Sequence, residues 1–297
     1  MSHFVVIVVS EHGENWEDQL VPYSENAEVS PYWEEISGWE LDHVLGQLDG
    51  LEGTARQLVG QDELTAAVAI ANQAAERDGE YRVTDGVIER LCTHNPDGKW
   101  DWHCMGGRWT GYFHAKKEAL EEGQVRLGDR GVFGDPPKPG RIDQGRKCDI
   151  DFERARKEAE KEAEGLWLEW EAAFSEHGKP ASFAHCREVL FPGDIDAARQ
   201  HYGNQKAIQA VLKHGFFMEC PVDIIGFDKE AYIEQQGFSA LVPFAILDSD
   251  GWHERGRMIA FGLAVDEQDP AAWGKQVAKL FDDLPDDAIL TAVDCHT

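Results

Sequence analysis

The residues best suited to chemistry lie close together, between positions 100 and 109. This stretch contains Trp100-Asp101-Trp102 and then Gly106-Gly107-Arg108-Trp109. Aromatic faces beside a guanidinium suit a planar, anionic ligand such as a base joined to a phosphate. Paired glycines let the backbone bend or let a ligand approach it closely. We therefore expect a ligand site formed by Trp100, Asp101, Trp102, Gly106, Gly107, Arg108 and Trp109.

The same stretch also has a structural explanation. Tryptophans on a strand are frequently part of a hydrophobic core. Arg108 could likewise pair with Asp101 as an internal brace. Both explanations are open at the level of the sequence.

Two acidic motifs could carry acid–base or metal chemistry. On a strand, Asp294 and His296 share one face, while Cys295 lies on the other, so the pair could bind a metal, exchange protons or form an ion pair. Asp149 and Asp151 are two residues apart and could hold a divalent metal, or Asp151 could cap the helix that follows. We treat Asp149, Asp151, Asp294 and His296 as candidate catalytic residues. A divalent metal is the only cofactor that the sequence suggests.

Familiar sequence signatures of common enzyme classes are missing. The chain contains no GxxxxGK[ST], no GxGxxG after a strand, no HExxH and no GxSxG. These absences argue against the common nucleotide triphosphatases, dinucleotide-dependent enzymes, zincins and α/β-hydrolases. The sequence therefore leaves open whether the protein is an enzyme.

Composition narrows the choice of partners. The chain of 297 residues has 56 acidic and 28 basic residues and a net charge of −28, which argues against direct nucleic-acid binding because phosphates need a basic surface. The acidity is compatible with basic partners, with mimicry of DNA or with a soluble surface. The longest apolar run, Phe4–Val9, is too short to span a membrane. We expect all six cysteines to be reduced, because none forms a CxxC pair and no export signal precedes them.

Hydrophobic periodicity and turn signals predict an α+β fold. We expect the strands at the two ends of the chain to lie in the same sheet, and the 100–109 stretch to join a small antiparallel meander. Asp149–Gly178 should form the clearest helix, with Phe152, Ala159, Ala163, Leu166 and Trp170 buried. The expected strands are Phe4–Ser10, Tyr81–Thr84, Val87–Thr93, Ala240–Leu247, Gly251–Val265 and Ile289–His296, and the other expected helices are Trp39–Leu48, Asp62–Arg77, Ile195–Lys213 and one that begins after Asp269-Pro270.

The chain is expected to form a single domain over residues 1–297. Three lobes within it are conceivable: 1–122, 148–215 and 216–297. Residues 123–147 are rich in Gly, Pro and basic residues, and we interpret them as a long loop. Loops of this length within a domain are often functional.

Several segments resemble a family of uncharacterised proteins from tailed bacteriophages. The most distinctive are Lys99-Trp100-Asp101-Trp102 and Gly106-Gly107-Arg108-Trp109, and the segment Leu290-Thr291-Ala292-Val293-Asp294-Cys295-His296 near the C-terminus is also similar. The other similar segments are the opening Met1–Val9, Gln19–Asn26, Asp149–Phe152 and Leu284–Asp287. Residues 27–80 depart from the family. The family has no assigned activity or catalytic residues, so the resemblance implies a viral accessory protein in a host cytoplasm and transfers no residue role.

Two functional hypotheses follow. The first is a phage-encoded accessory protein that binds a host protein or a small nucleotide-like ligand and counters or redirects a host defence system. The second is a metal-dependent enzyme that processes nucleotides or other small molecules through Asp149, Asp151, Asp294 and His296. Either protein could form a homo-oligomer. A structural particle component is disfavoured because the chain lacks coiled-coil, repeat or fibre composition.

Overall fold

The computed structural model describes residues 3–45, 61–74, 80–131, 136–212, 221–225, 228–259 and 263–297. Their helices and strands form an α+β fold, as the sequence predicts. Contacts divide the chain into two compact units. Unit 1 comprises Met1–Gln19 with His103–Thr297, and unit 2 comprises Leu20–Trp102. The boundary therefore cuts through the 100–109 stretch, and the single-domain interpretation stays a prediction.

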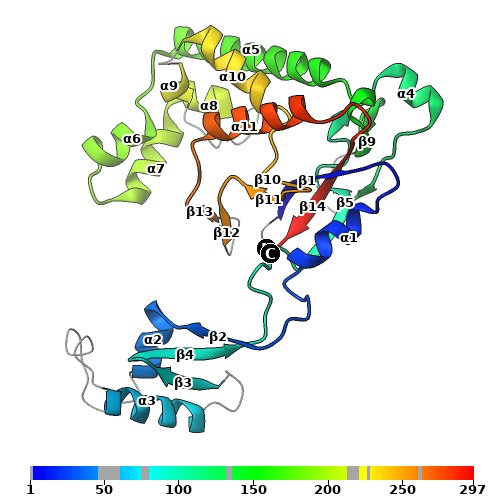
Figure 1. The fold of residues 1–297 in the computed structure, drawn as a ribbon. Coiled ribbons are helices and arrows are strands. Elements are labelled where there is room, and N and C mark those ends of the chain that lie inside the picture. The colour runs from blue at the N-terminus through cyan, green and yellow to red at the C-terminus, as the bar shows by residue number, and fades with distance from the viewer. Residues whose placement is uncertain are drawn as a thin grey trace. The chain divides into compact units, whose positions relative to one another are not determined.

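Unit 1 is built on a seven-stranded mixed sheet (Figure 1). Its central pair is β1 (His3–Ser10) and β14 (Ile289–His296), which run antiparallel and pair at all eight positions, from His3↔His296 to Ser10↔Ile289. The prediction that the two ends of the chain share a sheet is thus confirmed. The strand order is β11 (Gly251–Glu254), β10 (Ala245–Asp248), β1, β14, β5 (Trp102–Gly107) and β7 (Asp129–Arg130), and β9 (Gln144–Arg146) also pairs with β14.

Continuous apolar sequence explains why β1 and β14 lie in the middle of the sheet. Every residue of β1 after His3 is buried, and so are six of the eight residues of β14. On one face, Val5, Ile7 and Val9 belong to a core cluster with Trp273, Val277 and Phe281, which come from one side of helix α11 (Pro270–Asp283). Asp269 caps this helix by accepting a hydrogen bond from the Ala272 N–H at 2.9 Å, as Asp269-Pro270 predicts.

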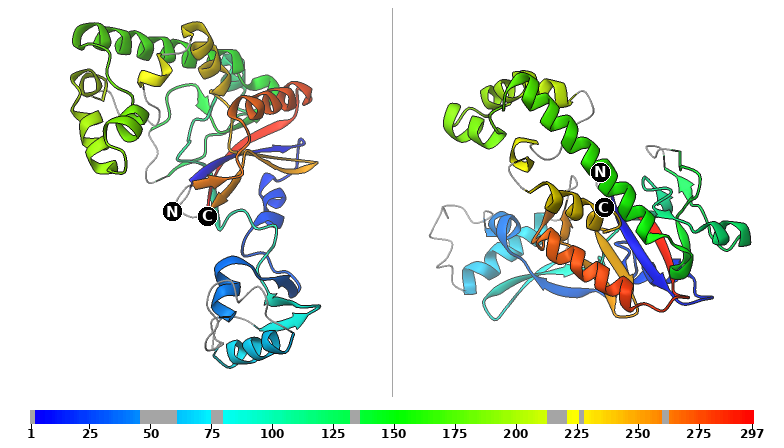
Figure 2. Two further views of the ribbon diagram at one scale, coloured as in Figure 1. Left: turned by 90° about the vertical axis from the view of Figure 1, so that its left-hand side faces the viewer. Right: turned by 90° about the horizontal axis from the view of Figure 1, so that it is seen from above.

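Unit 1 also contains a group of helices around the long helix α5 (Phe152–His177), which is green in Figure 2. It packs against α10 (Lys229–Ser239) and α8 (Lys206–Leu212). Of the residues expected to be buried, Ala163 and Trp170 are buried, whereas Phe152, Ala159 and Leu166 are only partly buried. The buried face of α5 also includes Trp167, which is not among the residues expected to be buried. Trp167 is 3% exposed and packs on Tyr232 with ring centroids 5.6 Å apart.

Unit 2 holds a three-stranded antiparallel sheet in the order β2 (Tyr32–Glu35), β4 (Val87–Cys92) and β3 (Tyr81–Thr84). Helices α2 (Gly38–Leu45) and α3 (Gln61–Ala74) supply its apolar core with Val44, Leu45, Ala67 and Val68. Asp85 and Gly86 both have positive φ, 49° and 84°, which is the backbone of the predicted type I′ hairpin turn.

Several predicted elements are wrong in detail. The third strand beside this hairpin is β2, not the 100–109 stretch, whose strand β5 joins the large sheet. The expected loop 123–147 contains β7, β8 (Arg141–Ile142) and β9. The single helix expected over 195–213 is divided at Gln205, which is extended, into α7 (Ile195–Asn204) and α8. Strand 240–247 begins only at Ala245, and 251–265 contains β11, β12 (Arg257–Ile259) and β13 (Leu263–Val265).

Short elements complete the described chain. They are α1 (Trp16–Leu20), η1 (Val21–Tyr23), β6 (Phe113–His114), α4 (Lys117–Glu122), η3 (Lys147–Asp149), α6 (Phe183–His185), η4 (Cys186–Leu190) and α9 (Pro221–Ile224). None of the helices in the described residues is both long and apolar enough to cross a membrane.

The first prediction concerns the start of α5. Asp151 accepts a hydrogen bond from the Arg154 N–H at 2.9 Å, so it is the N-cap that the sequence predicts. Asp151→Ala should lower the free energy of unfolding by about 1 kcal/mol, whereas Asp151→Asn should change it by only a few tenths, since asparagine caps about as well as aspartate. Urea unfolding measures both, with Asp287→Ala at an exposed turn as the control. Equal losses in both Asp151 variants would contradict the assignment.

Candidate functional site

Gly106 and Gly107, at the end of β5, make room for two buried carboxylates. Both glycines have positive φ, +80° and +56°, a conformation that residues with a Cβ rarely adopt. A Cβ on Gly106 would lie 2.7 Å from Asp143 Oδ2, and a Cβ on Gly107 would overlap the Asp294 carboxylate. The pair therefore bends the backbone and also permits a close approach, but the groups that approach are side chains of the same protein.

Asp143 is the first of these carboxylates, and it is fully buried. Its Oδ1 accepts hydrogen bonds from the backbone N–H groups of Gly111 at 2.6 Å and Tyr112 at 3.1 Å. Its Oδ2 accepts one from the Gly128 N–H at 2.9 Å. Burial raises the pKa of Asp143, and the three backbone donors offset part of that increase. One side chain thus joins the turn after β5 to the segment before β7.

Asp294 is the second carboxylate and is 1% exposed. Its Oδ1 lies 2.8 Å from Nδ1 of His3, and its Oδ2 accepts a hydrogen bond from the backbone N–H of Arg108 at 2.9 Å. The ring of His296 packs edge-on against the ring of His3, with centroids 5.0 Å apart. The register of β1 on β14 brings these groups together, because His3 pairs directly with His296. We call His3, Asp294, His296 and Arg108 the sheet-edge site, because they lie where β1 begins and where β14 and β5 end, at the edge of the sheet that is formed by strand ends.

The sheet-edge site places two imidazoles beside one buried carboxylate. An imidazole whose Nδ1 faces a buried carboxylate is held in a fixed orientation, an arrangement that recurs in sites of general acid–base catalysis. Both oxygens of Asp294 have hydrogen-bond partners within the protein. The His3 side chain is 15% exposed, and Arg108 is exposed. The exposed Arg130 pairs with Gly107 at the neighbouring strand β7, and Asp129 of the same strand pairs with Gly106, so charges of both signs lie near the site.

The cysteines near this site are poor nucleophiles. Burial raises the pKa of Cys104 to about 11, with smaller contributions from Asp294, Asp129 and Asp143. Burial also raises the pKa of Cys295 well above its usual value. Both thiols are therefore protonated near neutral pH, and only thiolates attack efficiently. No disulfide joins the five cysteines in the described part of the chain, and Cys220 lies outside it.

The other candidate carboxylates lie at the opposite end of β14. Arg146 pairs with Ile289 at the start of that strand, and Asp294 follows five residues later, roughly 17 Å along it. Asp149 accepts two hydrogen bonds from Arg146, from Nε to Oδ2 at 2.6 Å and from Nη2 to Oδ1 at 2.9 Å. Asp151 caps α5. The structure thus brings Asp294 and His296 together but does not join Asp149 and Asp151 to them.

The predicted tryptophan site is divided between the two units. Trp100, Asp101 and Trp102 belong to unit 2, and Gly106, Gly107, Arg108 and Trp109 belong to unit 1. Trp100 is buried at 7% exposure, whereas Trp102 is 47% exposed. Trp109 is partly buried against the core of unit 1. The structural explanation therefore fits Trp100 and Trp109, and Trp102 keeps an exposed aromatic face.

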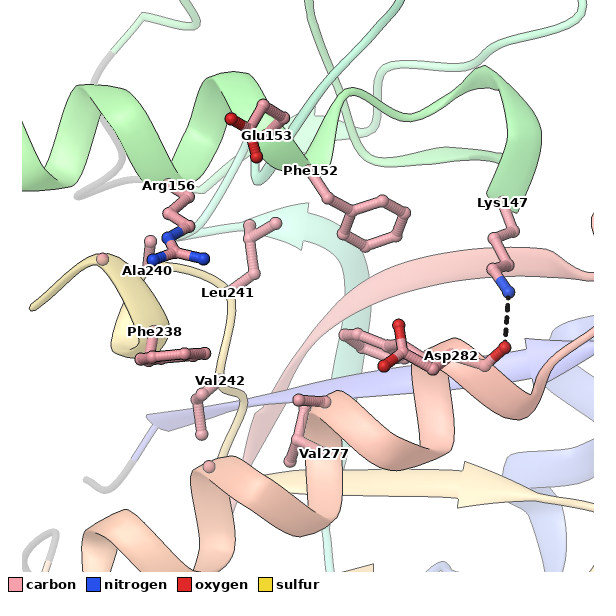
Figure 3. A pocket seen from close by; sticks show the side chains of 14 residues that line it. Lys147, Phe152, Glu153, Arg156, Phe238, Ala240, Leu241, Val242, Val277 and Asp282 are labelled. Carbon is pink, nitrogen blue, oxygen red and sulfur yellow. Dashed lines mark hydrogen bonds between the residues drawn. The ribbon is translucent and has the colours of Figure 1, made fainter. Parts of the chain in front are cut away.

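A separate cavity of about 350 Å³ lies between α5, α10 and α11 (Figure 3). Its lining is mostly apolar, with Leu241 and Phe281 among the side chains. The cations at its edge already have partners: Arg156 donates to Glu160 Oε1 at 2.7 Å, and Lys147 donates to the carbonyl oxygens of Asp282 at 3.0 Å and Leu284 at 2.6 Å. The cavity thus offers packing surface but no converging catalytic groups.

Two residues escape the sequence analysis: His3 of the sheet-edge site, and Asp143, the other carboxylate buried beside the glycine pair. His3 stands alone ahead of an apolar strand, and Asp143 lies inside the segment that we interpret as a loop. The signal for His3 is its position opposite His296 once the two end strands pair. Asp143 gives no local signal, since its partners are backbone groups of distant turns.

Comparisons with family models, with curated proteins and with solved structures found no match for this chain. The assignment of a site therefore depends on the geometry of this chain alone.

The second prediction tests the glycines against a matched control. Gly107→Ala should lower the free energy of unfolding by about 3 kcal/mol or more, because it combines a left-handed alanine with displacement of a buried, hydrogen-bonded carboxylate. Gly123→Ala is the control: Gly123 also has positive φ, +70°, but a Cβ there meets nothing within 4 Å. It should cost only about 1 kcal/mol. Equal losses in chemical denaturation would show that Asp294 does not require Gly107.

Proposed function

We propose that this protein binds a small, anionic, nucleotide-like ligand at the sheet-edge site. The observation that carries the proposal is the double hydrogen bond of buried Asp294, which fixes the His3 imidazole and the backbone of Arg108 on the two oxygens of one carboxylate. A rigid, pre-organised set of donors lowers the entropic cost of binding. In a chain with a net charge of −28, this place carries two imidazoles and the exposed Arg108 and Arg130 beside its carboxylates.

The side chain of Arg108 has the chemistry that a nucleotide-like ligand requires. Arg108 bonds Asp294 through its backbone N–H, which any residue except proline would supply. This hydrogen bond therefore does not require an arginine at position 108. A guanidinium offers five donors and a flat face, which suit both a phosphate and a base.

The biological setting that we propose comes from the resemblance to tailed-bacteriophage proteins. A phage accessory protein in a host cytoplasm would use such a site to sequester or sense a nucleotide-like signal, and so counter or redirect a host system. A host protein is the other partner that this setting allows. The exposed face of Trp102 is a candidate contact for it, since exposed aromatic residues are frequent at interfaces.

The third prediction tests ligand binding. Nucleoside monophosphates, triphosphates and cyclic dinucleotides are titrated into the full chain by calorimetry. A ligand that binds the wild type should bind Arg108→Ala at least tenfold more weakly. Arg108→Lys should also bind more weakly at an unchanged melting temperature, because lysine keeps the charge but loses the bidentate fork. Arg199→Ala, at an exposed helix position, is the control.

Two outcomes would contradict this proposal. One is that none of these nucleotides binds the wild type. The other is that both Arg108 variants melt at lower temperature yet bind normally while folded, which would make Arg108 a structural residue.

A second candidate function is processing of the bound ligand. The observation that favours it is the His3 Nδ1–Asp294 Oδ1 contact of 2.8 Å, because a buried carboxylate that orients an imidazole is a recurrent arrangement for a general base. In this case Asp294 and His296 keep the roles suggested by the sequence, and His3 replaces Asp149 and Asp151.

The fourth prediction separates processing from binding alone. If the protein processes nucleotides, ³¹P NMR of a nucleotide incubated with the wild type should show new products. Asp294→Asn should then slow turnover at least a hundredfold, because an amide cannot stabilise a protonated His3. Asp151→Asn, which preserves the helix cap, should leave turnover unchanged. An unaltered nucleotide spectrum with the wild type would exclude processing of the nucleotides tested.

A further inference from the structure

We propose that Glu34, Cys92 and His94 of unit 2 bind a divalent transition metal of the zinc type. The proposal concerns a different unit and different residues from the sheet-edge site and does not depend on nucleotide binding. Cys92 ends β4 and pairs with Tyr32 of β2. Glu34 lies two residues further along β2, so Glu34 and Cys92 are diagonal neighbours on one face of the sheet. His94 follows Cys92 by two residues.

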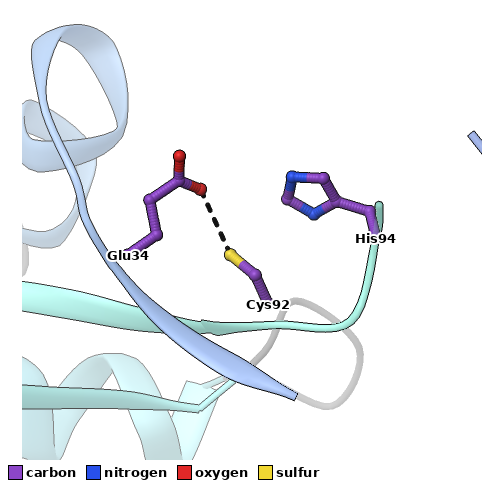
Figure 4. A group of neighbouring side chains, drawn as sticks. All are labelled: Glu34, Cys92 and His94. Atoms are coloured by element: carbon purple, nitrogen blue, oxygen red, sulfur yellow. Dashed lines mark hydrogen bonds between the residues drawn. The ribbon is translucent and has the colours of Figure 1, made fainter. Parts of the chain in front are cut away.

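The three potential ligand atoms already converge (Figure 4). One ligand atom from each residue lies within 4.8 Å of the other two. The Cys92 thiol donates a hydrogen bond to Glu34 Oε2 with a separation of 3.3 Å. Ligands placed tetrahedrally around zinc at about 2.0–2.3 Å lie roughly 3.3–3.8 Å from one another. The Cys92–Glu34 pair already has this spacing, and the exposed His94 needs only a side-chain adjustment.

The identity of the ligands selects the class of metal. Thiolate and imidazole favour zinc and similar transition metals, whereas magnesium and calcium require sets of oxygen ligands. Three protein ligands leave a fourth position for water or another molecule. The Tyr32 hydroxyl lies 3.4 Å from His94 Nε2, and the two rings are in edge-to-face contact at 6.0 Å. Tyr32 thus contacts the imidazole at the start of β2.

The charges around the cluster are compatible with a metal. Arg90 lies beside the cluster: its Nη2 is 4.0 Å from Glu34 Oε2, and its side chain also interacts with Cys92. Arg90 also donates from Nη1 to Glu40 Oε1 at 3.0 Å, so a second carboxylate compensates its charge. A carboxylate and a thiolate then neutralise the two charges of the metal. Cys92 is 2% exposed, which protects the metal–sulfur bond from solvent, and Glu34 and His94 lie on the exposed side from which an ion would enter.

The fifth prediction uses Co²⁺ as a spectroscopic probe of the full, reduced chain. The wild type should bind one equivalent of Co²⁺ at this site and show a thiolate-to-cobalt charge-transfer band in the near ultraviolet, which Zn²⁺ abolishes by displacement. Cys92→Ser should remove the band, and Cys148→Ser should keep it. His94→Gln and Glu34→Gln should weaken Co²⁺ binding at least tenfold. Glu35→Gln is the matched control, because Glu35 is the next residue of β2 and points to the other face.

His94→Gln keeps the test decisive if Cys92→Ser fails to fold, because His94 is exposed. The proposal is overturned if the wild type gives no charge-transfer band. It is also overturned if the band persists in Cys92→Ser, or if His94→Gln and Glu34→Gln bind Co²⁺ as tightly as Glu35→Gln. None of these results bears on nucleotide binding, which is measured without added metal and through Arg108.

Discussion

The arrangement of unit 1 around β5 depends on the burial of two carboxylates against two glycines. An isolated carboxylate buried without partners is strongly destabilising. Asp143 avoids this cost through three backbone N–H groups, and Asp294 avoids it through His3 and the Arg108 N–H. These hydrogen bonds form only because Gly106 and Gly107 carry no Cβ. The two glycines and the two carboxylates therefore depend on one another for their positions, although the glycine pair, Asp143 and Asp294 are far apart in the sequence.

Elements with strong local signals could be predicted from the sequence. The apolar runs of β1 and β14, the Asp85-Gly86 turn, the Asp269 cap and the Asp151 cap each depend on a few adjacent residues. In contrast, β2 is four residues long, is acidic and follows Pro31, so only its pairing with β4 makes it a strand. Strands β7, β8 and β9 have two or three residues each and are likewise defined by their partners.

The residues of the candidate site likewise divide into those with a local sequence signal and those that are defined only by distant partners. Asp294, Gly106, Gly107 and Arg108 carry a sequence signal, because their residue types are unusual in their surroundings. His3 becomes a site residue only through the register of β1 on β14, and Asp143 only through the turns that it accepts hydrogen bonds from. Asp149 has the composition of a metal ligand, yet Arg146 occupies both of its oxygens. The roles of His3 and Asp143 depend on pairings between segments that are distant in the sequence. Such pairings cannot be inferred from a single sequence.

The pairing of β1 with β14 also has a consequence for how the chain folds. His3 and Asp294 are separated by 291 positions, and closing a loop of that length costs about 3 kcal/mol more than closing one of ten residues. The other neighbour of β1 is β10, which also comes late in the chain. During synthesis, the apolar Phe4–Val9 segment therefore emerges long before either of its strand partners. Until then it presents two open edges, the kind of surface that chaperones protect and that aggregation exploits.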